Sequence, residues 1–381
     1  MKNQISVVGA SVAGLLSSAI IAERGVQVTV YEEHREIGIP EKCDALVSSK
    51  GMAELGVVPP SNIVQNHLAR AIFFSPSGKE IQIDARRQNV IVMDRSRFDR
   101  FLAEKAARAG AKIELGTRVS RIGQSQNSAL LNIESDMIES DVLIDCSGYE
   151  SYIRGGGDTL QGALYLVYGT WFDKSTVEVY VDPKKAPGFF TWVIPIGSDI
   201  AKIGIAGAGI NTFQALDRFV DEKNAVPIRK MAAPVVCSGT LRQFVEGRIA
   251  RAGDAAGQAK PTTGGGIYTG GYGGVLAGIS AAKSIEEGNP NSLREYEDAW
   301  KAKFGREFRL QYLARNAFAK MTSEQLDKLF EMVSSSEIPK MISEEGDFDR
   351  HSIAIARAFG FSKSLAAFGM LFSNELKSLL S

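Results

Sequence analysis

The chain of 381 residues contains few of the side chains that build disulfides and metal sites. It has three cysteines, Cys43, Cys146 and Cys237, and only three histidines, which lie far apart. No two cysteines are spaced as in zinc ribbons or iron–sulfur motifs, so the sequence predicts no metal site. An odd cysteine count also argues against a disulfide framework and favours a reducing cytoplasm.

An excess of charge of either sign is also lacking. Lys plus Arg and Asp plus Glu number 44 each, so the formal net charge is zero. Proteins that bind nucleic acids usually carry a basic excess, so no nucleic-acid partner is expected. The uncharged run 4–22 is interrupted by Gly9 and Gly14 and favours a strand followed by a helix, not a signal peptide or membrane span.

The N-terminus fits a strand–helix–strand unit. The pattern predicts a strand over Ile5–Val8, a helix from about Val12 to Arg24 and a second strand over Val26–Tyr31. Both strands are apolar throughout, as in a parallel sheet that is buried on both faces.

The turn between the first strand and the helix reads "GASVAG". Gly9 permits the tight turn, Gly14 permits close approach of helix and strand, and Ser11 takes the place of the usual second glycine. Backbone N–H groups at the helix start point at a pyrophosphate, and Glu32, after the second strand, suits the ribose hydroxyls. The unit therefore predicts dinucleotide binding, in preference to a purely structural turn.

A second glycine-rich region follows a strand near Arg248. Gly253-Asp254 ends that strand, Pro261 follows in a loop, and seven glycines lie between Gly264 and Gly274. Glycine weakens a helix, so close approach of a bound cofactor explains the run better than a glycine-lined helix–helix contact does. Asp254 suits a polyol chain, and the helix start near Gly265–Ile267 suits a negatively charged ring.

The rest of the chain indicates a divided α/β (α+β) protein. A helix is predicted over 97–109, antiparallel sheet within 165–208 and helices from Leu293 onward. We expect a discontinuous FAD-type domain from 1–70, 90–155 and 240–300, a sheet domain from 71–89 and 156–239, and a helical region over 301–381.

The two glycine motifs and Glu32 together resemble the glutathione-reductase-type FAD fold of the aromatic-hydroxylase class. In that class an arginine near the FAD aligns with Arg95. A middle motif with Asp-Gly appears here as "DCSGYES", with Ser147 at the aspartate position. The resemblance implies FAD as cofactor. The residues expected to bind it are Gly9, Ser11, Ala13, Gly14, Glu32, Glu33, Cys43, Arg95, Gly253, Asp254, Pro261, Gly264, Gly265, Gly266 and Ile267.

Within the class the chain is most similar to archaeal geranylgeranyl reductases. "EIGIPEKCDALVS" resembles that family's Pro-x-x-Cys-Gly-Glu region, with Asp44 and Ala45 in place of Gly-Glu. "APGFFTWVIPIG" resembles its Tyr-x-Trp-x-Phe-Pro-Lys motif, keeping Trp192 and Pro195.

Four residues are candidates for catalysis: Cys43 as a proton-donating or site-shaping thiol, Trp192 and Phe190 as aromatic faces, and Tyr268 beside the flavin or substrate. Packing is the open alternative for each of them, as it is for Phe189 and Tyr272.

The resemblance implies an FAD-dependent oxidoreductase that reduces carbon–carbon double bonds of an isoprenoid (geranylgeranyl) lipid or related polyprenyl substrate. An aromatic-hydroxylase-type monooxygenase, or a non-catalytic protein that binds FAD and lipid, are the alternatives. The expected electron donor is NAD(P)H or a ferredoxin, and a monomer is expected. The tail from Ser362 has apolar residues at helical spacing, which suits packing on the protein or peripheral contact with a membrane.

Overall fold

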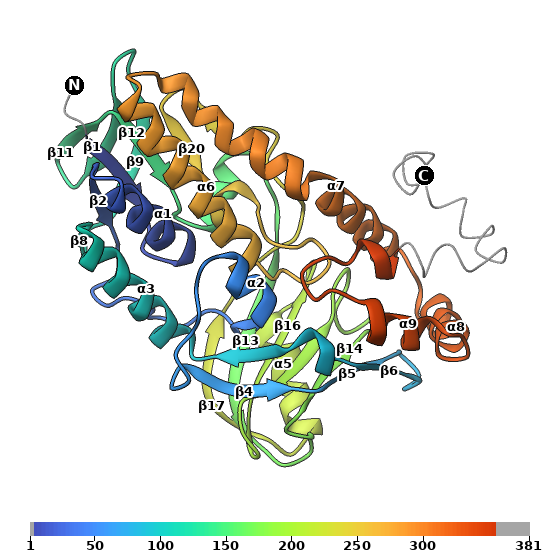
Figure 1. Cartoon of the computed structure of the whole chain (residues 1–381). Coiled ribbons are helices and arrows are strands. Elements are labelled where there is room, and N and C mark those ends of the chain that lie inside the picture. The colour runs from blue at the N-terminus through green and yellow to red at the C-terminus, as the bar shows by residue number, and fades with distance from the viewer. Residues whose placement is uncertain (1–3, 356–381) are drawn as a thin grey trace. The chain divides into compact units, whose positions relative to one another are not determined.

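The computed structural model describes residues 4–355 and shows a mixed α/β fold (Figure 1). The chain forms two compact units, each assembled from three separate stretches. Of the described residues, unit 1 comprises 4–41, 95–158 and 236–306, and unit 2 comprises 42–94, 159–235 and 307–355. The predicted tail from Ser362 lies outside the described residues.

Unit 1 contains a six-stranded sheet in the order β19-β20-β12-β1-β2-β8. β1 pairs in parallel with β2 and β12, β2 with β8, and β12 with β20. β19 pairs with β20 in antiparallel fashion. The strands are β1 (Gln4–Val8), β2 (Gln27–Tyr31), β8 (Lys112–Glu114), β12 (Val142–Asp145), β19 (Val245–Glu246) and β20 (Ile249–Arg251). The central strands β1, β2 and β12 are buried almost throughout, which explains their uninterrupted apolar sequences.

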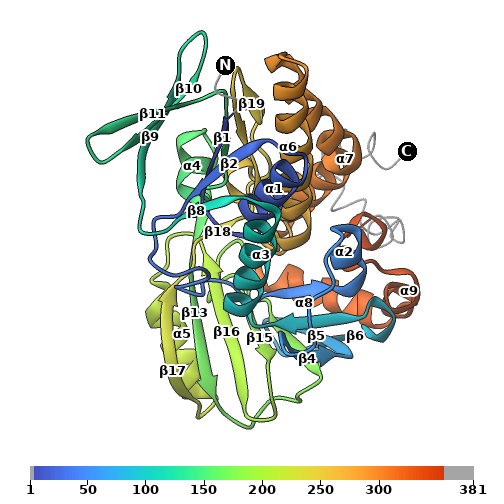
Figure 2. The ribbon, with the colours of Figure 1, turned by 60° about the vertical axis from the view of Figure 1, so that its left-hand side comes forward.

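Helix α1 packs against both α3 and α6 within unit 1 (Figure 2). A second small sheet, β11-β10-β9, adds an antiparallel meander. These and the remaining elements of the unit are α1 (Val12–Glu23), α3 (Arg95–Ala109), β9 (Val119–Gln124), β10 (Ala129–Ile133), β11 (Asp136–Ser140), α4 (Tyr149–Arg154), η2 (Gly253–Ala256), α6 (Ile267–Glu286), η3 (Pro290–Leu293) and the first half of α7 (Arg294–Phe318).

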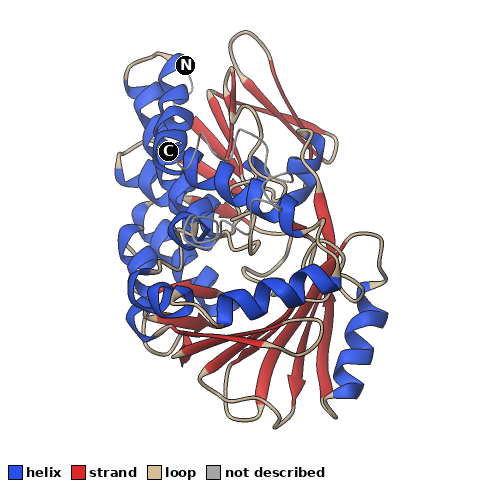
Figure 3. Ribbon diagram, turned by 90° about the vertical axis from the view of Figure 1, so that its right-hand side faces the viewer, coloured by secondary structure: helices blue, strands red, loops and turns tan. Residues whose placement is uncertain are grey.

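Unit 2 is built on a larger sheet, in which the strands follow the order β17-β13-β16-β15-β14-β5-β6. Figure 3 draws these strands in red as one layer. They are β5 (Arg70–Phe74), β6 (Glu80–Asp84), β13 (Thr159–Tyr168), β14 (Thr176–Tyr180), β15 (Thr191–Pro195), β16 (Ile200–Gly207) and β17 (Val226–Ala232). All neighbours pair antiparallel except β14 and β5.

One face of this sheet is closed by α5, whose Leu216, Phe219 and Val220 share a core with Tyr165 and Ile203. A three-stranded sheet, β3-β7-β4, supplies Leu68, Val90 and Val92 to a further core that includes Ile194 and Trp192. These remaining elements are β3 (Leu46–Ser48), α2 (Ser49–Glu54), β4 (Val64–Leu68), η1 (Arg86–Gln88), β7 (Val90–Met93), α5 (Thr212–Glu222), α8 (Ser323–Ser334) and α9 (Ile338–Glu345).

The predicted fold class is confirmed, including the parallel N-terminal sheet, the antiparallel sheet over 165–208 and the helices after Leu293. The compact units divide the chain elsewhere than the sequence suggested. Residues 42–70 belong to unit 2, where β3 and β4 pair with β7, and residues 307–355 belong there as well. The division into an FAD domain, a sheet domain and a helical domain therefore stays a prediction.

Candidate functional site

The "GASVAG" loop of unit 1 is shaped by its two glycines. Gly9 has φ of +95°, and a Cβ atom there would lie 2.5 Å from the carbonyl oxygen of Cys146. A Cβ atom at Gly14 would lie 2.0 Å from the carbonyl oxygen of Gly9. Any side chain at either position would collide with backbone, so the turn from β1 into α1 requires glycine at both.

Glu32 closes this loop from the end of β2. Its carboxylate accepts a hydrogen bond from the Ala10 N–H at 2.8 Å and one from the His34 N–H at 3.0 Å. The His34 ring lies 2.6 Å from the same carboxylate. The Glu33 carboxylate lies 3.6 Å from Arg118 and 3.8 Å from Nε2 of His34. Glu32 is thus held against the glycine loop, where a ribose acid is expected.

Arg95, at the start of α3, reaches the same loop. Its guanidinium donates to Ser11 Oγ at 2.6 Å and to the carboxylate of Asp99 at 2.8 Å. Asp99 is almost fully buried, and this burial raises its pKa, while Arg95 opposes the shift. The structure therefore brings together two residues that the sequence predicted as cofactor contacts, and adds Asp99, which was not among the predicted cofactor contacts.

Helices α1 and α6 both begin in this region. The N-cap residue of α1, Ser11, makes no side-chain cap hydrogen bond, Gly266 at the start of α6 has no side chain to make one, and neither helix has an acidic residue in its first turn. The positive end of a helix dipole favours an anion when it is not neutralised by a side chain. Both helix starts therefore fit the charged groups of a dinucleotide.

The loop before α6 folds back on itself around Asp254. A Cβ atom at Gly266 would lie 3.1 Å from Asp254 Oδ1, so the carboxyl faces the start of α6. Desolvation by the surrounding protein atoms raises the pKa of Asp254, although the residue keeps solvent-exposed surface, and Arg95 opposes that shift. Hydrogen bonds from Gly264 N–H to the Lys260 carbonyl and from Lys260 N–H to the Gly265 carbonyl fix the loop around the buried Pro261.

Glycine is required inside α6 for a different reason from the one that the sequence suggested. A Cβ atom at Gly274 would lie 2.2 Å from the Ala13 carbonyl oxygen, and one at Gly278 2.7 Å from that of Ser17. A Cβ atom at Gly273 would meet Gln258 Oε1 at 2.0 Å. These glycines therefore serve close packing of α6 against α1 and the preceding loop. The sequence suggested that a bound cofactor explains the whole glycine run. That expectation is wrong for Gly273 and Gly274, whereas Gly264–Gly266 stay candidates for contact with the cofactor.

Tyr268 and Tyr272 lie on one face of α6 and contact α7. Both rings pack edge-on against Phe304, with centroids 5.6 Å and 5.5 Å apart, and Tyr268 is 5% exposed. Phe304 in turn contacts Trp300, whose indole donates to the Thr269 carbonyl. Helix packing accounts for both tyrosines, and a catalytic role of Tyr268 stays a proposal.

Ser147, at the position where the class has aspartate, donates hydrogen bonds to a neighbouring carboxylate. Its backbone N–H and hydroxyl both donate to the fully buried carboxylate of Asp145, at 3.0 Å and 2.6 Å. Ser151 donates to the other oxygen of the same carboxylate. The middle motif thus stabilises a buried acid at the end of β12.

In unit 2 the Cys43–Ala45 turn is attached to the larger sheet. The Ala45 N–H donates to Cys43 Sγ at 3.4 Å, and Ala45 has φ of +56°, which is uncommon outside glycine. The indole of Trp192 donates to Asp44 Oδ2 at 2.8 Å, and Lys202 donates to the Asp44 carbonyl at 3.2 Å. The sequence did not single out Lys202, although a lone lysine in an apolar strand was the available signal.

Three aromatic rings gather at the start of β15. Phe189 and Phe190 stack with centroids 4.1 Å apart, and Trp192 lies edge-on to Phe190 at 5.7 Å. Phe190 also packs against Phe330 of α8 and Met321. The structure brings together the three aromatics predicted as a group, and each of them also contributes to packing.

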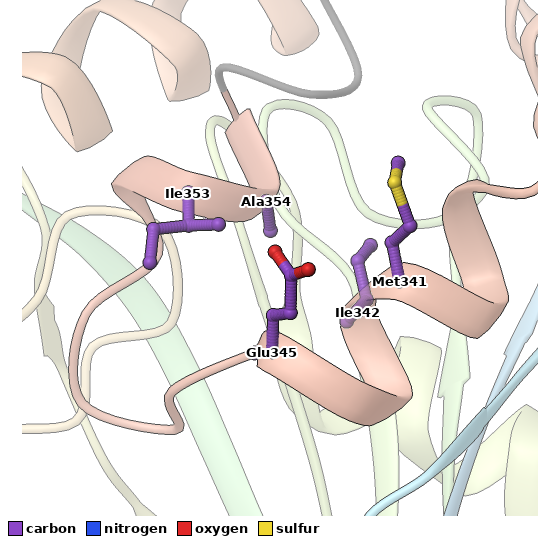
Figure 4. Close-up of a pocket in the computed structure, with 6 residues that line it drawn as sticks. Met341, Ile342, Glu345, Ile353 and Ala354 are labelled. Carbon is purple, nitrogen blue, oxygen red and sulfur yellow. The ribbon is translucent and has the colours of Figure 1, made fainter.

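Unit 2 contains a further pocket that is formed by other residues. It is lined by Met341, Ile342, Glu345, Gly346, Ile353 and Ala354, with Glu345 pointing toward Ala354 (Figure 4). It shares no residue with the predicted site. Within residues 4–355 no group of His, Cys, Asp and Glu suits a metal ion, and no helix has the length and apolar character needed to cross a membrane.

Comparison with known proteins identifies the family. A model of the FAD binding domain matches residues 2–303. Digeranylgeranylglycerophospholipid reductase of Methanocaldococcus jannaschii is 30% identical over 359 residues, covering 87% of this chain and 90% of the relative. Digeranylgeranylglycerophospholipid reductase 2 of Methanopyrus kandleri is 28% identical over 376 residues, covering 91% and 94%.

A solved structure shares the fold. It is a geranylgeranyl bacteriochlorophyll reductase-like protein from Thermoplasma acidophilum, with a TM-score of 0.84 and 22% identity, covering 97% of this chain and 99% of that one. Together with the glycine loop, Glu32 and Arg95, these matches show that the cofactor is FAD. The chain therefore belongs to the FAD binding domain family and, within it, to the digeranylgeranylglycerophospholipid reductase family of FAD-dependent oxidoreductases.

Proposed function

We propose that the protein saturates carbon–carbon double bonds in the geranylgeranyl chains of an isoprenoid lipid. The observation that carries this proposal is similarity to digeranylgeranylglycerophospholipid reductases over about nine-tenths of both chains. A chain that matches its relatives along nearly their whole length has both the cofactor-binding parts and the parts outside them. Substrate recognition by those relatives is therefore the best guide to the substrate here.

Unit 1 supplies the FAD site in this proposal. The start of α1 and Arg95 bind the pyrophosphate, Glu32 binds the adenosine ribose, and Asp254 binds the ribityl chain. The start of α6, at Gly264–Ile267, faces the flavin pyrimidine, where its dipole stabilises negative charge. Reduced FAD supplies the hydride for alkene saturation when it is bound.

Unit 2 supplies the acid and the apolar lining. The Cys43 thiol delivers a proton to the alkene carbon, and the indole of Trp192 and the ring of Phe190 stabilise the positive charge that develops on the neighbouring carbon. The half-exposed position of Cys43 supports this assignment, because Cys146 and Cys237 are buried and packed as small apolar side chains.

Electrons reach the protein from an external donor in this proposal, because the sequence has one dinucleotide fingerprint. NAD(P)H or a ferredoxin would serve, and the protein would act as a monomer. A peripheral contact with the membrane would bring it to its lipid substrate.

The direct test is anaerobic turnover of a defined lipid. The purified holoprotein is mixed with digeranylgeranylglycerophospholipid in detergent micelles, with dithionite, NADPH or reduced ferredoxin as donor. We expect mass spectrometry to show addition of two hydrogens for each double bond reduced. A product that forms only with oxygen and carries an added oxygen atom, or no product with any of the three donors, would contradict the proposal.

Cys43 has its own test. Cys43→Ser is expected to retain FAD at a full molar ratio and to lower kcat by about tenfold or more, because serine is a far weaker acid than the thiol at neutral pH. Cys237→Ser is the matched control and should leave kcat unchanged. Full activity of Cys43→Ser would remove this thiol from the proposed mechanism.

A further inference from the structure

A carboxylate, an indole and a buried ammonium meet at one point of unit 2. Asp44 Oδ2 accepts the indole N–H of Trp192 at 2.8 Å, and Asp44 Oδ1 is shielded from solvent. Lys202 is 3% exposed and donates to the backbone carbonyls of Asp44 at 3.2 Å and Met93 at 3.4 Å. Burying charged groups away from water costs free energy unless each of them is hydrogen-bonded or paired. The presence of this arrangement therefore needs an explanation.

The sheet register places these groups on one face. Trp192 of β15 lies opposite Gly204 of β16, and Ile194 lies opposite Lys202. Lys202 and Gly204 are two residues apart on one strand and therefore project to the same side. A Cβ atom at Gly204 would lie 2.2 Å from Cζ2 of Trp192, so glycine is needed for the indole to lie where it does.

Asp44 holds the indole ring of Trp192 in this place at its N–H group. A hydrogen bond to an ionised acceptor is about twice as strong as a neutral one, and it fixes the direction in which the N–H points. Lys202 supports this arrangement, because its ammonium donates to the backbone carbonyl of Asp44 and so fixes the segment that carries the carboxylate. Gly204, Asp44 and Lys202 together determine the ring orientation.

The carboxylate also changes what the ring does to a nearby cation. The negative π face of an indole attracts positive charge, and an anion that accepts its N–H adds electron density to the ring. We propose that Asp44 is a positioning residue for Trp192: its carboxylate orients the indole and strengthens the attraction of the ring for the positive charge that develops on an isoprenoid carbon. This inference rests on the proposed function. Asp44 stands where the resembling family's Pro-x-x-Cys-Gly-Glu region has glycine, which has no side chain to accept this bond.

Three variants separate orientation from charge. Asp44→Asn keeps an acceptor oxygen and removes the charge, Asp44→Ala removes both, and Trp192→Phe keeps a ring but removes the N–H. We expect Asp44→Asn to lower kcat by about tenfold with KM within about twofold of wild type, because the charge acts on the transition state and not on the bound substrate. Asp44→Ala should lower kcat further.

Two readouts distinguish this role from a merely structural one. The ultraviolet resonance Raman band of the Trp192 indole N–H, assigned by difference from Trp192→Phe, should report a strong hydrogen bond in wild type and lose it in Asp44→Ala. In the Trp192→Phe background, Asp44→Asn should lower kcat no further, because the two residues act as one unit. Independent, multiplying effects of the two substitutions would overturn the proposal.

Asp217→Asn is the matched control. Asp217 lies on α5, accepts hydrogen bonds from Tyr165 and Lys230, and belongs to the same unit. Its amide variant should have the kcat of wild type. Wild-type turnover together with an unchanged kcat in Asp44→Asn would overturn the role of Asp44 and leave the proposed function standing. Absence of wild-type turnover of the lipid would overturn both.

Discussion

Arg95 connects the buried acid Asp99 to the glycine loop, so under the proposed function one side chain contributes to both stability and cofactor binding. Its side chain is 13% exposed and that of Asp99 is 6% exposed. Arg95→Met leaves the Asp99 carboxyl buried without its cation, and we expect the free energy of unfolding of the FAD-free protein to fall by about 3 kcal/mol. Urea denaturation measures it. FAD affinity should also fall by about tenfold, because the charged hydrogen bond proposed between Arg95 and the pyrophosphate is lost.

The double variant Arg95→Met/Asp99→Leu separates these two effects. It replaces the ion pair with apolar side chains, so stability should return to within about 1 kcal/mol of wild type. FAD affinity should stay low, because the guanidinium is still absent. Recovery of FAD affinity in the double variant would show that Arg95 acts only through the stability of α3.

The placement of residues that belong to one local motif was predictable, and that of residues joined by sheet register was not. Gly9, Gly14 and Glu32 follow from spacing within one strand–helix–strand unit. Asp44 and Trp192 are 148 residues apart, and their contact depends on β15, β16 and the turn after Glu41 assembling in one register. Lys202 donates to the main-chain carbonyls of Asp44 and Met93, and such acceptors have no residue-type signature.

Helices α1 and α6 pack at a distance that only glycine permits. A Cβ atom at Gly274 would lie 2.2 Å from the backbone oxygen of Ala13. Gly274→Ala should therefore lower the free energy of unfolding by about 2–3 kcal/mol, because α1 and α6 would have to move apart to admit the methyl group. Gly305→Ala, within α7, is the control. Its Cβ atom would meet only the Lys301 Cβ atom at 3.8 Å, so it should raise stability by about 0.5–1 kcal/mol.

The Glu297 carboxylate joins helix α7 to the strand region before β20. Glu297 accepts hydrogen bonds from the Phe244 N–H at 2.8 Å, the Val245 N–H at 3.0 Å and the Lys301 ammonium. Burial raises the pKa of Glu297, but these hydrogen bonds outweigh it and hold the pKa below the ordinary 4.5. A lowered pKa means that the contribution to stability is complete above pH 4.5 and is lost as the pH falls through the folded-state value.

Glu297→Gln should accordingly lower the free energy of unfolding by about 1–2 kcal/mol at pH 7. The difference from wild type should shrink as the pH is lowered toward 4, where the wild-type carboxyl begins to protonate. Glu324→Gln, in an exposed ion pair with Lys328, is the control and should change stability little at any pH. A difference for Glu297→Gln that is constant between pH 7 and 4 would contradict the assignment.

At the scale of the whole molecule, strand and helix types were predictable, while the grouping of segments was not. Apolar strands that alternate with helices predict a parallel sheet, and the structure confirms it. Short strands carry too little pattern to show which sheet they join. β3 and β4 follow the FAD-type segment in sequence but pair with β7, so residues 42–70 lie in unit 2.

FAD should stabilise the molecule through both halves of the dinucleotide. The glycine loop, Glu32 and Arg95 are expected to bind the pyrophosphate and adenosine, whereas Asp254 and the start of α6 are expected to bind the ribityl chain and the ring. Removal of FAD should therefore lower the melting temperature. Free FAD at about a hundredfold above its Kd should restore about 2.7 kcal/mol.

FMN retains the ring, the ribityl chain and one phosphate but lacks the adenosine half. At equal concentration it should raise the melting temperature much less than FAD, because Glu32 then has no ribose to bind and binding falls well short of saturation. Glu32→Gln should reduce the shift caused by FAD and leave the smaller shift caused by FMN unchanged. Equal shifts with the two flavins in wild type would mean that the N-terminal loop does not bind adenosine, although its glycines and acid have the geometry for it.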